Sequence, residues 1–515
     1  MSSYGQRSIL RSNMAKPENE KLSPDANRDR HYVSVLKVLL GSLLLLSAIS
    51  YIKFGPYLSP DTLSYVKLSE GHSDLLSSLS PFYPFLLTLP PLTLLPLIDR
   101  ILLLSILAIG GLFWLLVKIA RRSGNHFSLI FLSFGISSMS WWSFRVIGSA
   151  HADSLFYLLL VAWLYLFIWG DKEENYYLPA LGSLSAVMVW VKLNALFLLP
   201  LLLIWGCIER KKGWFLIAGT TLLSWLVYQW IVPENILRYH LAASPLSERS
   251  ALEAVALLYE NLSTWMQVSI GLVISDTLSH YIPRLLAFVL GVVWLAFLLL
   301  FLIGHKNKIG NKRYALLLFG TTYSLFFLAF QQWAGFREIN FRTLFPYLLA
   351  VSWSLWLFLL RINRPKTLLV LALLVTGHTG VGHLLLWQRG NVASLFEARS
   401  FHNSELRTDI LKLLEGKRVA IRTDYPEKLM LSYRDRAVIR LDPTHAFVNG
   451  KNEPIDPAAR WQERQASLLS LMQGTAVIVL FQPTPFWKKV AENPSIQALI
   501  DNEALILYGD EALAK

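Results

Sequence analysis

The chain has very little cysteine and very little charge for its length. Its single cysteine, Cys207, in 515 residues excludes an internal disulfide. Only 16% of the residues are charged and 54% are hydrophobic, with a mean hydropathy of +0.43. A soluble globular protein of ordinary composition does not have these values. The composition therefore predicts a polytopic membrane protein.

Other features are missing as well. The first apolar run, 33–54, is long enough to span a membrane and shows no small-residue cleavage site, so it is predicted to be a retained anchor rather than a secretory signal. The net charge of +13 comes from scattered basic residues without one basic patch, which argues against nucleic acid as a partner. The chain shows no internal repeat and no low-complexity tract.

Basic residues between the apolar runs predict the topology. A span needs about 20 apolar residues, and Lys and Arg in short loops mark the cytoplasmic face. We expect about 11 transmembrane helices within a domain over 33–388, preceded by a cytoplasmic polar leader at 1–32. With this arrangement the basic clusters at 118–122, 210–212 and 361–366 all fall on the cytoplasmic face.

Two outer segments interrupt the predicted spans. The first outer loop, 55–98, ends in the proline-rich stretch 81–98, which we expect to be interfacial because a span there would reverse every later basic cluster. The second outer segment, 233–283, carries amphipathic patches at 252–262 and 265–274. These patches are predicted to lie along the outer interface.

The final part of the chain, 389–515, has a different pattern. Short apolar runs of strand length alternate with helical patterns, and this alternation predicts a small extracytoplasmic α/β domain with a largely parallel sheet. No glycine-rich phosphate loop follows any predicted strand, so we expect a cap or recognition module. The predicted strands are 418–422, 437–441, 476–480 and 504–507, and the predicted helices are 403–415, 456–473 and 486–500.

Polar residues at the predicted outer ends of the helices form a candidate site. Asp61 is the most informative, because an ionised group beside the hydrocarbon region is costly and seldom kept without a use. The other candidates at outer helix ends or in outer loops are His151, Asp153, Lys192, Arg337 and Arg342. The topology predicts that these side chains can converge on one site.

The order of the motifs resembles that of the GT-C glycosyltransferases, which include protein O-mannosyltransferases and aminoarabinose transferases. Asp61 and Tyr65, with Pro81-Phe-Tyr-Pro84, look like their first outer loop, and His151-Ala-Asp153 resembles their second acidic motif. Val189-Trp-Val-Lys192 looks like their lysine-bearing hairpin, and Arg342-Thr-Leu-Phe-Pro346 resembles the start of a late helix. The chain departs from many members at Thr62, where a second acid often follows the first.

The chemistry can be argued from the residues. An outward-facing enzyme has no cytoplasmic nucleotide sugars, so an activated sugar has to arrive on a lipid, and a polyprenyl phosphate provides a good leaving group. Inverting transfer to a lipid, glycan or protein hydroxyl passes through an oxocarbenium-like transition state. We expect Asp61 to be the general base, with Asp153 as a second catalytic carboxylate. Lys192 and Arg342, with Arg337 as a third cation, are expected to bind the donor phosphate.

Each candidate also has a structural alternative. Asp61 and Asp153 could each cap a helix N-terminus. Lys192 could extend toward the outer headgroups, and Arg342 could serve only to orient its helix. His151 could be a hydrogen-bonded interfacial histidine.

Two other function classes are open, a transporter or flippase of a lipid-linked glycan and a non-catalytic assembly protein. A transporter favours inverted repeats and ionisable residues at the membrane midplane, which this pattern does not show. No cofactor is expected, although Asp61 and Asp153 could share a divalent cation. The expected location is the inner (plasma) membrane of a bacterium, with membrane lipids, a lipid-linked donor and an acceptor as partners.

Overall fold

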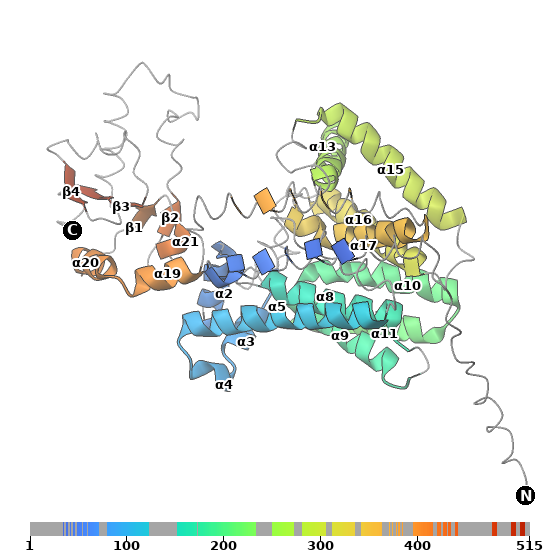
Figure 1. Ribbon diagram of the computed structural model, residues 1–515, viewed down its shortest axis with the longest axis horizontal. Helices are drawn as coiled ribbons and strands as arrows, with labels where there is room; N and C mark the ends of the chain where they lie inside the picture. Colours follow the sequence, from blue (N-terminus) through green and yellow to red (C-terminus); the bar gives the residue numbers. More distant parts are fainter. Residues whose placement is uncertain are drawn as a thin grey trace, which may run out of the picture.

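The structure of the protein, a computed structural model, describes a largely helical body and a small sheet (Figure 1). The described residues are 55–58, 60–71, 80–122, 152–171, 174–232, 250–271, 281–304, 312–334, 341–362, 395–415, 420–423, 426–429, 431–433, 438–440, 476–481, 496–500 and 505–509, with single helical positions within 34–53 and 370–384.

Four described helices are long and apolar enough to cross a membrane. They are α8 (Ala152–Trp169), α11 (Lys212–Ile231), α15 (Arg284–Gly304) and the Tyr314–Trp333 part of α16 (Lys312–Ala334). A helix of about 20 residues covers the hydrocarbon core of a bilayer. The chain is therefore a membrane protein.

Further helices complete the described part of the body. They are α5 (Leu97–Arg122), α9 (Tyr177–Val191), the short 3-10 helix η3 (Leu193–Phe197), α10 (Leu198–Glu209), α13 (Ala251–Gly271) and α17 (Phe341–Ile362). The apolar pattern also predicts spans at about 127–147 and about 367–387. The first lies outside the described residues, and the second is described only at scattered helical positions. The predicted number of spans stays a prediction.

Buried aromatic side chains and interhelical hydrogen bonds join α8, α9 and α11. The indole Nε1 of Trp163 donates to Ser185 Oγ at 2.8 Å between α8 and α9, and Trp190 Nε1 donates to Ser224 Oγ at 3.0 Å between α9 and α11. Within apolar surroundings an indole N–H without a partner is costly, so hydroxyl partners on neighbouring helices stabilise the packing. These contacts join α9 to α8 on one side and to α11 on the other.

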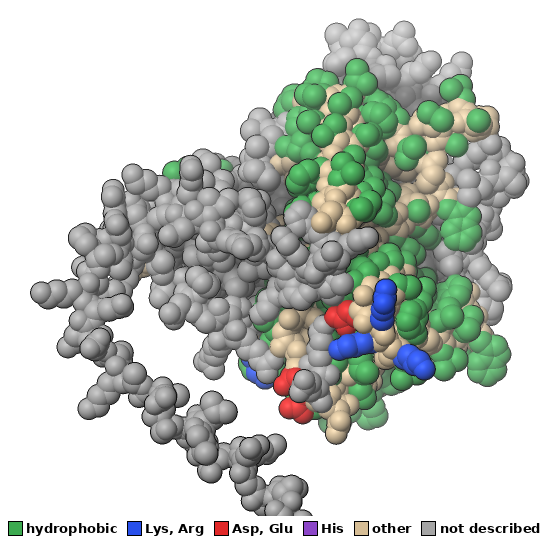
Figure 2. Space-filling model, turned by 90° about the vertical axis from the view of Figure 1, so that its right-hand side faces the viewer, with side chains coloured by type: hydrophobic (Ala, Val, Ile, Leu, Met, Phe, Trp, Pro, Cys, Tyr) green, Lys and Arg blue, Asp and Glu red, His purple; other side chains and the backbone are tan. Residues whose placement is uncertain are grey.

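The outward face of the helical body is apolar. Leu216 and Trp230 on α11, and Leu300 and Ile303 on α15, are at least 66% exposed. Figure 2 shows hydrophobic side chains over most of the described surface on one face, with most of the visible charged side chains gathered in its lower part. An apolar surface of this extent is suited to contact with lipid.

The second outer segment contains one continuous helix, α13, where two amphipathic patches were predicted. Its start is a capping box, since the Ser250 backbone N–H donates to Glu253 Oε2 at 2.8 Å and the Glu253 N–H donates to Ser250 Oγ at 3.2 Å. The helix packs on α15, α16 and α17. Part of its surface remains apolar and open, including Leu252 at 80% exposure.

The first outer loop folds into short helices. These are α2 (Pro60–Ser69), α3 (Phe82–Leu87) and α4 (Pro90–Thr93). Neither α3 nor α4 is long enough to cross a bilayer, which agrees with the prediction that the proline-rich stretch does not form a span. Prolines lack a backbone N–H and break longer helices.

The C-terminal part forms a five-stranded sheet with the order β2-β1-β3-β5-β4. Its described elements are α19 (Leu395–His402), α20 (Glu405–Leu413), α21 (Pro426–Leu429), β1 (Ala420–Thr423), β2 (Val438–Arg440), β3 (Ala476–Leu480), β4 (Ile496–Ile500) and β5 (Leu505–Gly509). The four predicted strands agree with β1, β2, β3 and β5. The predicted helix 456–473 lies outside the described residues.

Two details of this domain differ from the prediction. The end of the predicted helix 486–500 is wrong, because Ile496–Ile500 is strand β4, antiparallel to β5. Its apolar residues also fit a helical period, and pairing with β5 decided the outcome. The sheet is mixed rather than largely parallel, since β1 pairs parallel with β2 and β3, whereas β3–β5 and β4–β5 are antiparallel.

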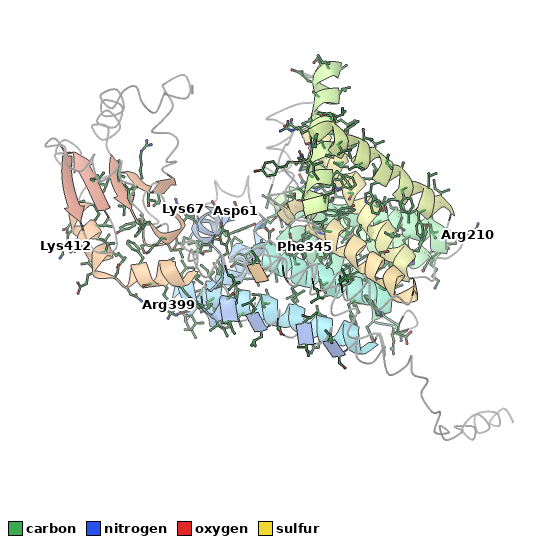
Figure 3. The ribbon with its side chains drawn as sticks, turned by 45° about the horizontal axis from the view of Figure 1, so that its top comes forward. Asp61, Lys67, Arg210, Phe345, Arg399 and Lys412 are labelled. Atoms are coloured by element: carbon green, nitrogen blue, oxygen red, sulfur yellow. The ribbon has the colours of Figure 1, made fainter. Side chains whose placement is uncertain are left out.

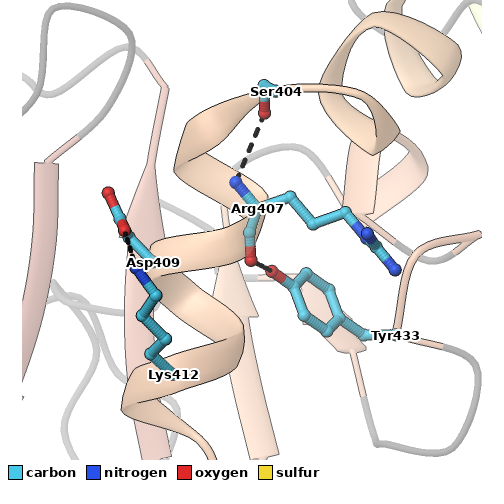
Figure 4. A network of polar contacts seen from close by, with 5 residues as sticks. All are labelled: Ser404, Arg407, Asp409, Lys412 and Tyr433. Carbon is cyan, nitrogen blue, oxygen red and sulfur yellow. Dashed lines mark hydrogen bonds and ion pairs between the residues drawn. The ribbon is translucent and has the colours of Figure 1, made fainter.

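Figure 4 shows how α20 is held against the rest of the domain. Ser404 is the N-cap, and its Oγ accepts a hydrogen bond from the Arg407 backbone N–H at 3.3 Å. The Tyr433 hydroxyl donates to the Arg407 carbonyl at 3.2 Å. The ion pair between Lys412 and Asp409 is exposed and contributes little.

Candidate functional site

The centre of the site is an ion pair between Lys192 and Asp153. The Lys192 ammonium donates to Asp153 Oδ1 across the contact between α9 and α8. The Asp153 side chain is only 1% exposed, whereas that of Lys192 is 19% exposed. A buried carboxylate is stabilised by such a partner. The lysine therefore neutralises a buried charge while part of it stays accessible.

Local sequence explains where these two charges lie. Asp153 is in the first turn of α8, where a negative charge is favoured by the helix dipole. Lys192 follows the last turn of α9. Its backbone is extended, which interrupts the helical structure between α9 and η3. A break of this kind within a membrane protein is tolerated where protein or a polar site covers the freed backbone groups.

A tyrosine connects this pair to α17. The Tyr323 hydroxyl of α16 donates to the backbone carbonyl of Thr343. The same hydroxyl lies within hydrogen-bonding reach of Asn194 and within electrostatic range of Asp153. Thr343 directly follows Arg342 in the first turn of α17. We call Asp153, Lys192, Asn194 and Tyr323 the polar cluster, and it contacts the helix turn that carries Arg342.

Aromatic rings surround the polar cluster. The Lys192 Nζ lies 5.9 Å from the centre of the Phe156 ring, within the range of a cation–π contact. Phe197 of η3 packs edge-on against Tyr323, with ring centres 4.8 Å apart. Tyr157 of α8 contacts Phe345 of α17 at 4.5 Å. The rings of Phe156, Tyr157, Phe197 and Phe345 are at most 1% exposed, and apolar surroundings of this kind strengthen electrostatic interactions.

Asp61 is the second residue of α2, after Pro60 at the first helical position. A carboxylate in the first turn is favoured by the helix dipole, and this placement differs from the N-cap considered as a structural alternative. The side chain is partly exposed. Figure 3 shows Asp61 and Phe345 in the half of the helical body that faces the C-terminal domain, and Arg210 at the opposite end.

Tyr65 is a packing residue of the same helix. It is 7% exposed, and its ring meets the Tyr83 ring of α3 edge-on at 5.3 Å. Burial raises the pKa of the Tyr83 phenol, which keeps this group neutral. Tyr65 and Val66 belong to the same hydrophobic core as Phe156 of α8. One apolar core therefore supports both α2 and the start of α8.

The remaining candidates are only partly described. His151 and Arg337 lie outside the described residues. Arg342 is described as part of α17, without its side chain. Among the described residues no group of three His, Cys, Asp or Glu side chains is arranged to hold a metal ion. The carboxylate of Asp153, one of two considered as metal ligands, is engaged by Lys192.

The sequence did not single out Tyr323 or Asn194. Tyr323 lies in an apolar span with many aromatic neighbours, and nothing in the pattern separates it from core or interfacial tyrosines. Asn194 follows Lys192 within the same short motif. The available signal for Asn194 was its side-chain amide, which lies in the first turn after a predicted helix break.

Comparison with known proteins gives limited information. No family model and no curated protein matches the chain. Among solved structures, the chain is similar to the crystal structure of ArnT from Cupriavidus metallidurans in the apo state, with 14% identity and a TM-score of 0.38 over 93% of this chain and 98% of that chain. At these values the likeness identifies neither a family nor an activity.

Proposed function

We propose that the protein is an integral-membrane glycosyltransferase that moves a sugar from a polyprenyl-phosphate donor to an acceptor hydroxyl at the outer face of the membrane, with inversion. The observation that carries the proposal is the polar cluster, in which Lys192 is paired with Asp153. Tyr323 lies within electrostatic range of Asp153 and donates to the turn that carries Arg342. The resemblance of the motif order to GT-C glycosyltransferases supports the same reading.

The proposed role of the cations is to bind the donor phosphate. Negative charge grows on the departing phosphate as the glycosidic bond breaks, and fixed cations stabilise it. Lys192 supplies a partly exposed ammonium held by Asp153, and Arg342 supplies a guanidinium suited to bidentate contact. Arg337 is a third cation. In this scheme Asp153 orients Lys192, and direct contact of its buried carboxylate with substrate is not required.

Asp61 is the proposed general base. The acceptor hydroxyl attacks the anomeric carbon from the face opposite the phosphate, forms the new glycosidic bond, and gives its proton to the Asp61 carboxylate. The phosphate leaves with the electron pair of the broken bond. A positioned base contributes about 10²- to 10⁴-fold to the rate. The partial exposure of Asp61 supports this role because an acceptor can reach it.

Transfer of a radiolabelled sugar from a panel of lipid-linked donors by the purified full chain tests the proposal. We expect Asp61→Asn to lower turnover by about 10²- to 10⁴-fold. The matched control is Asp409→Asn, which makes the same change at a carboxylate that is 51% exposed in the C-terminal domain. It should keep the turnover of the unmodified protein.

Two outcomes would count against the proposal. Full turnover by Asp61→Asn would remove the base assignment while leaving the reaction class intact. Absence of any transfer by the unmodified protein across the donor panel would remove the glycosyltransferase reading itself.

A further inference from the structure

The C-terminal domain contacts the short segment that directly precedes α2. The backbone N–H of Leu395, the first residue of α19, donates to the Pro56 carbonyl at 2.8 Å. Pro56 is buried and lies between the helical positions that end at 53 and α2, which begins at Pro60. This backbone contact links the start of α19 to the short connection that leads into the helix of Asp61.

A ring contact reinforces this attachment. Gly55 has a φ of +71°, and a Cβ atom at this position would lie 2.9 Å from two carbons of the Phe396 ring. The ring therefore lies directly on the glycine backbone. The Gly55 N–H also donates to the Tyr51 carbonyl at 2.8 Å and closes the last turn of the first helix, as a glycine in the left-handed region commonly does.

The helix α19 belongs to two hydrophobic cores at once. Leu395 and Ala398, both fully buried, are part of the core of the helical body. Phe401, one turn later, is part of the separate core of the C-terminal domain. Because close-packed cores transmit displacements, movement of the C-terminal domain is transferred through α19 to the helical body.

A second contact lies at the start of α5. Arg399 Nη2 is 3.2 Å from Asp99 Oδ1, and both side chains are at least 30% exposed. An exposed ion pair of this kind contributes little to stability. The buried contacts of Leu395 and Phe396 therefore define the attachment, and the ion pair adds orientation.

We propose that α19 is the element through which the C-terminal domain sets the position of Asp61, with Phe396 and Gly55 as positioning residues. This inference rests on the proposed function of Asp61 as the base of sugar transfer. In Figure 3 Asp61 and Lys67 of α2 lie between the C-terminal domain and the helical body, and Arg399 marks the course of α19. The domain thus acts on catalysis by holding α2, independently of any contact it makes with the acceptor.

The test introduces a steric clash between residue 55 and the Phe396 ring and then removes it with a second substitution. Gly55→Ala introduces both backbone strain and a clash with the Phe396 ring. Gly71→Ala is the matched control, because Gly71 has a φ of +97° and nothing within 4 Å of an added Cβ atom. Gly55→Ala combined with Phe396→Ala keeps the strain and removes the clash.

Two readouts are measured on the full chain in a Cys207→Ser background. The first is the distance between spin labels at Lys67→Cys on α2 and Lys412→Cys on α20. We expect this distance to shift or broaden in Gly55→Ala, to stay unchanged in Gly71→Ala, and to recover only in part in the double variant, which loses the Phe396 contact together with the clash. The second is sugar transfer, where we expect kcat to fall by about tenfold or more in Gly55→Ala with KM nearly unchanged, and to recover in part in the double variant.

Each outcome decides one question. An unchanged distance in Gly55→Ala overturns the proposed coupling, and so does a shifted distance with unchanged turnover. Loss of activity that Phe396→Ala does not restore even in part assigns the effect to strain alone and also overturns it. If the unmodified protein transfers no sugar, the proposed function fails, and the spin-label distances alone decide whether α19 positions α2.

Discussion

The ion pair between Lys192 and Asp153 makes folding stability and donor binding depend on the same lysine. Removing one partner of a buried pair leaves an uncompensated charge, whereas removing both charges together is much less costly. Since Asp153 is 1% exposed, loss of Lys192 alone affects the fold as well as the chemistry. A single substitution at Lys192 therefore cannot separate the two roles.

A pair of variants separates them. We expect Lys192→Met to lower the free energy of unfolding by about 3 kcal/mol, measured by thermal unfolding in detergent. Lys192→Met with Asp153→Asn should recover most of this stability because no buried charge remains. Sugar transfer should stay low in both variants because the phosphate has lost its cation. Recovery of transfer together with stability would show that Lys192 is only a structural partner.

Arg210 has a strained backbone conformation. It is the only residue other than glycine with a positive φ among the described residues, at 55°, and it ends α10. The left-handed region costs a residue with a side chain about 1–2 kcal/mol. Glycine adopts it freely, so the tight turn between α10 and α11 carries avoidable strain.

We expect Arg210→Gly to unfold at a higher temperature than Lys211→Gly, with a difference of about 1–2 kcal/mol in the free energy of unfolding. The two variants lose the same charge at neighbouring exposed positions, and Lys211 has an ordinary φ of −107°. Equal stability of the two would show that the turn relaxes without strain.

Among the elements, the outer segment from α3 to α5 depends on one arginine. Arg100 of α5 donates from Nε to the Leu95 carbonyl at 2.8 Å, from Nη1 to the Leu87 carbonyl at 3.2 Å, and from Nη2 to the Thr93 carbonyl at 3.1 Å. A guanidinium can satisfy three such acceptors at once because its donors are fixed in one plane. The side chain thus holds the short helices α3 and α4 on the start of α5.

Arg100→Lys keeps the charge and loses this geometry. We expect faster amide hydrogen exchange over 87–96 in the variant, while exchange in the buried helix α8 stays unchanged. Arg284→Lys, at an exposed position at the start of α15, is the matched control and should change neither region. Unchanged exchange over 87–96 in Arg100→Lys would show that the prolines alone fix the segment.

Across the protein, Arg210 and Lys412 lie at opposite ends (Figure 3). The charge pattern predicts that the end of Arg210 lies in the cytoplasm, and the same prediction puts the end that carries the C-terminal domain outside. The same orientation is needed if Asp61 is to meet a lipid-linked donor at the outer face. The proposed function therefore requires that the end with the C-terminal domain lies outside the membrane.

Labelling with a membrane-impermeant thiol reagent tests this orientation. In a Cys207→Ser background, we expect Lys412→Cys to react from the outside of intact spheroplasts and Lys211→Cys to react only after permeabilisation. Both positions are exposed, so access depends on the membrane. Reaction of Lys211→Cys from the outside would contradict the topology and the outward site together.

The sequence singled out Asp153 and Lys192, which the structure brings together, but it did not single out the residues around them. Asp61, Asp153 and Lys192 stand out because charges are rare and costly in apolar surroundings. Tyr323 carries no such signal, because a tyrosine in an apolar helix usually packs in the core or at the interface. Its hydrogen bond to Thr343 and its proximity to Asp153 depend on how α16 packs against α8 and α17.

The sequence by itself determined the membrane class and four of the five strands, because hydrophobic periodicity and charge are local properties of the chain. It did not predict the short helices α2, α3, α4, α19 and α21. The tertiary structure decided that Ile496–Ile500 is a strand, because pairing with β5 outweighed a helical period. It also paired Lys192 with Asp153 and seated Phe396 on Gly55. These contacts join residues far apart in the chain, and only packing brings such residues together.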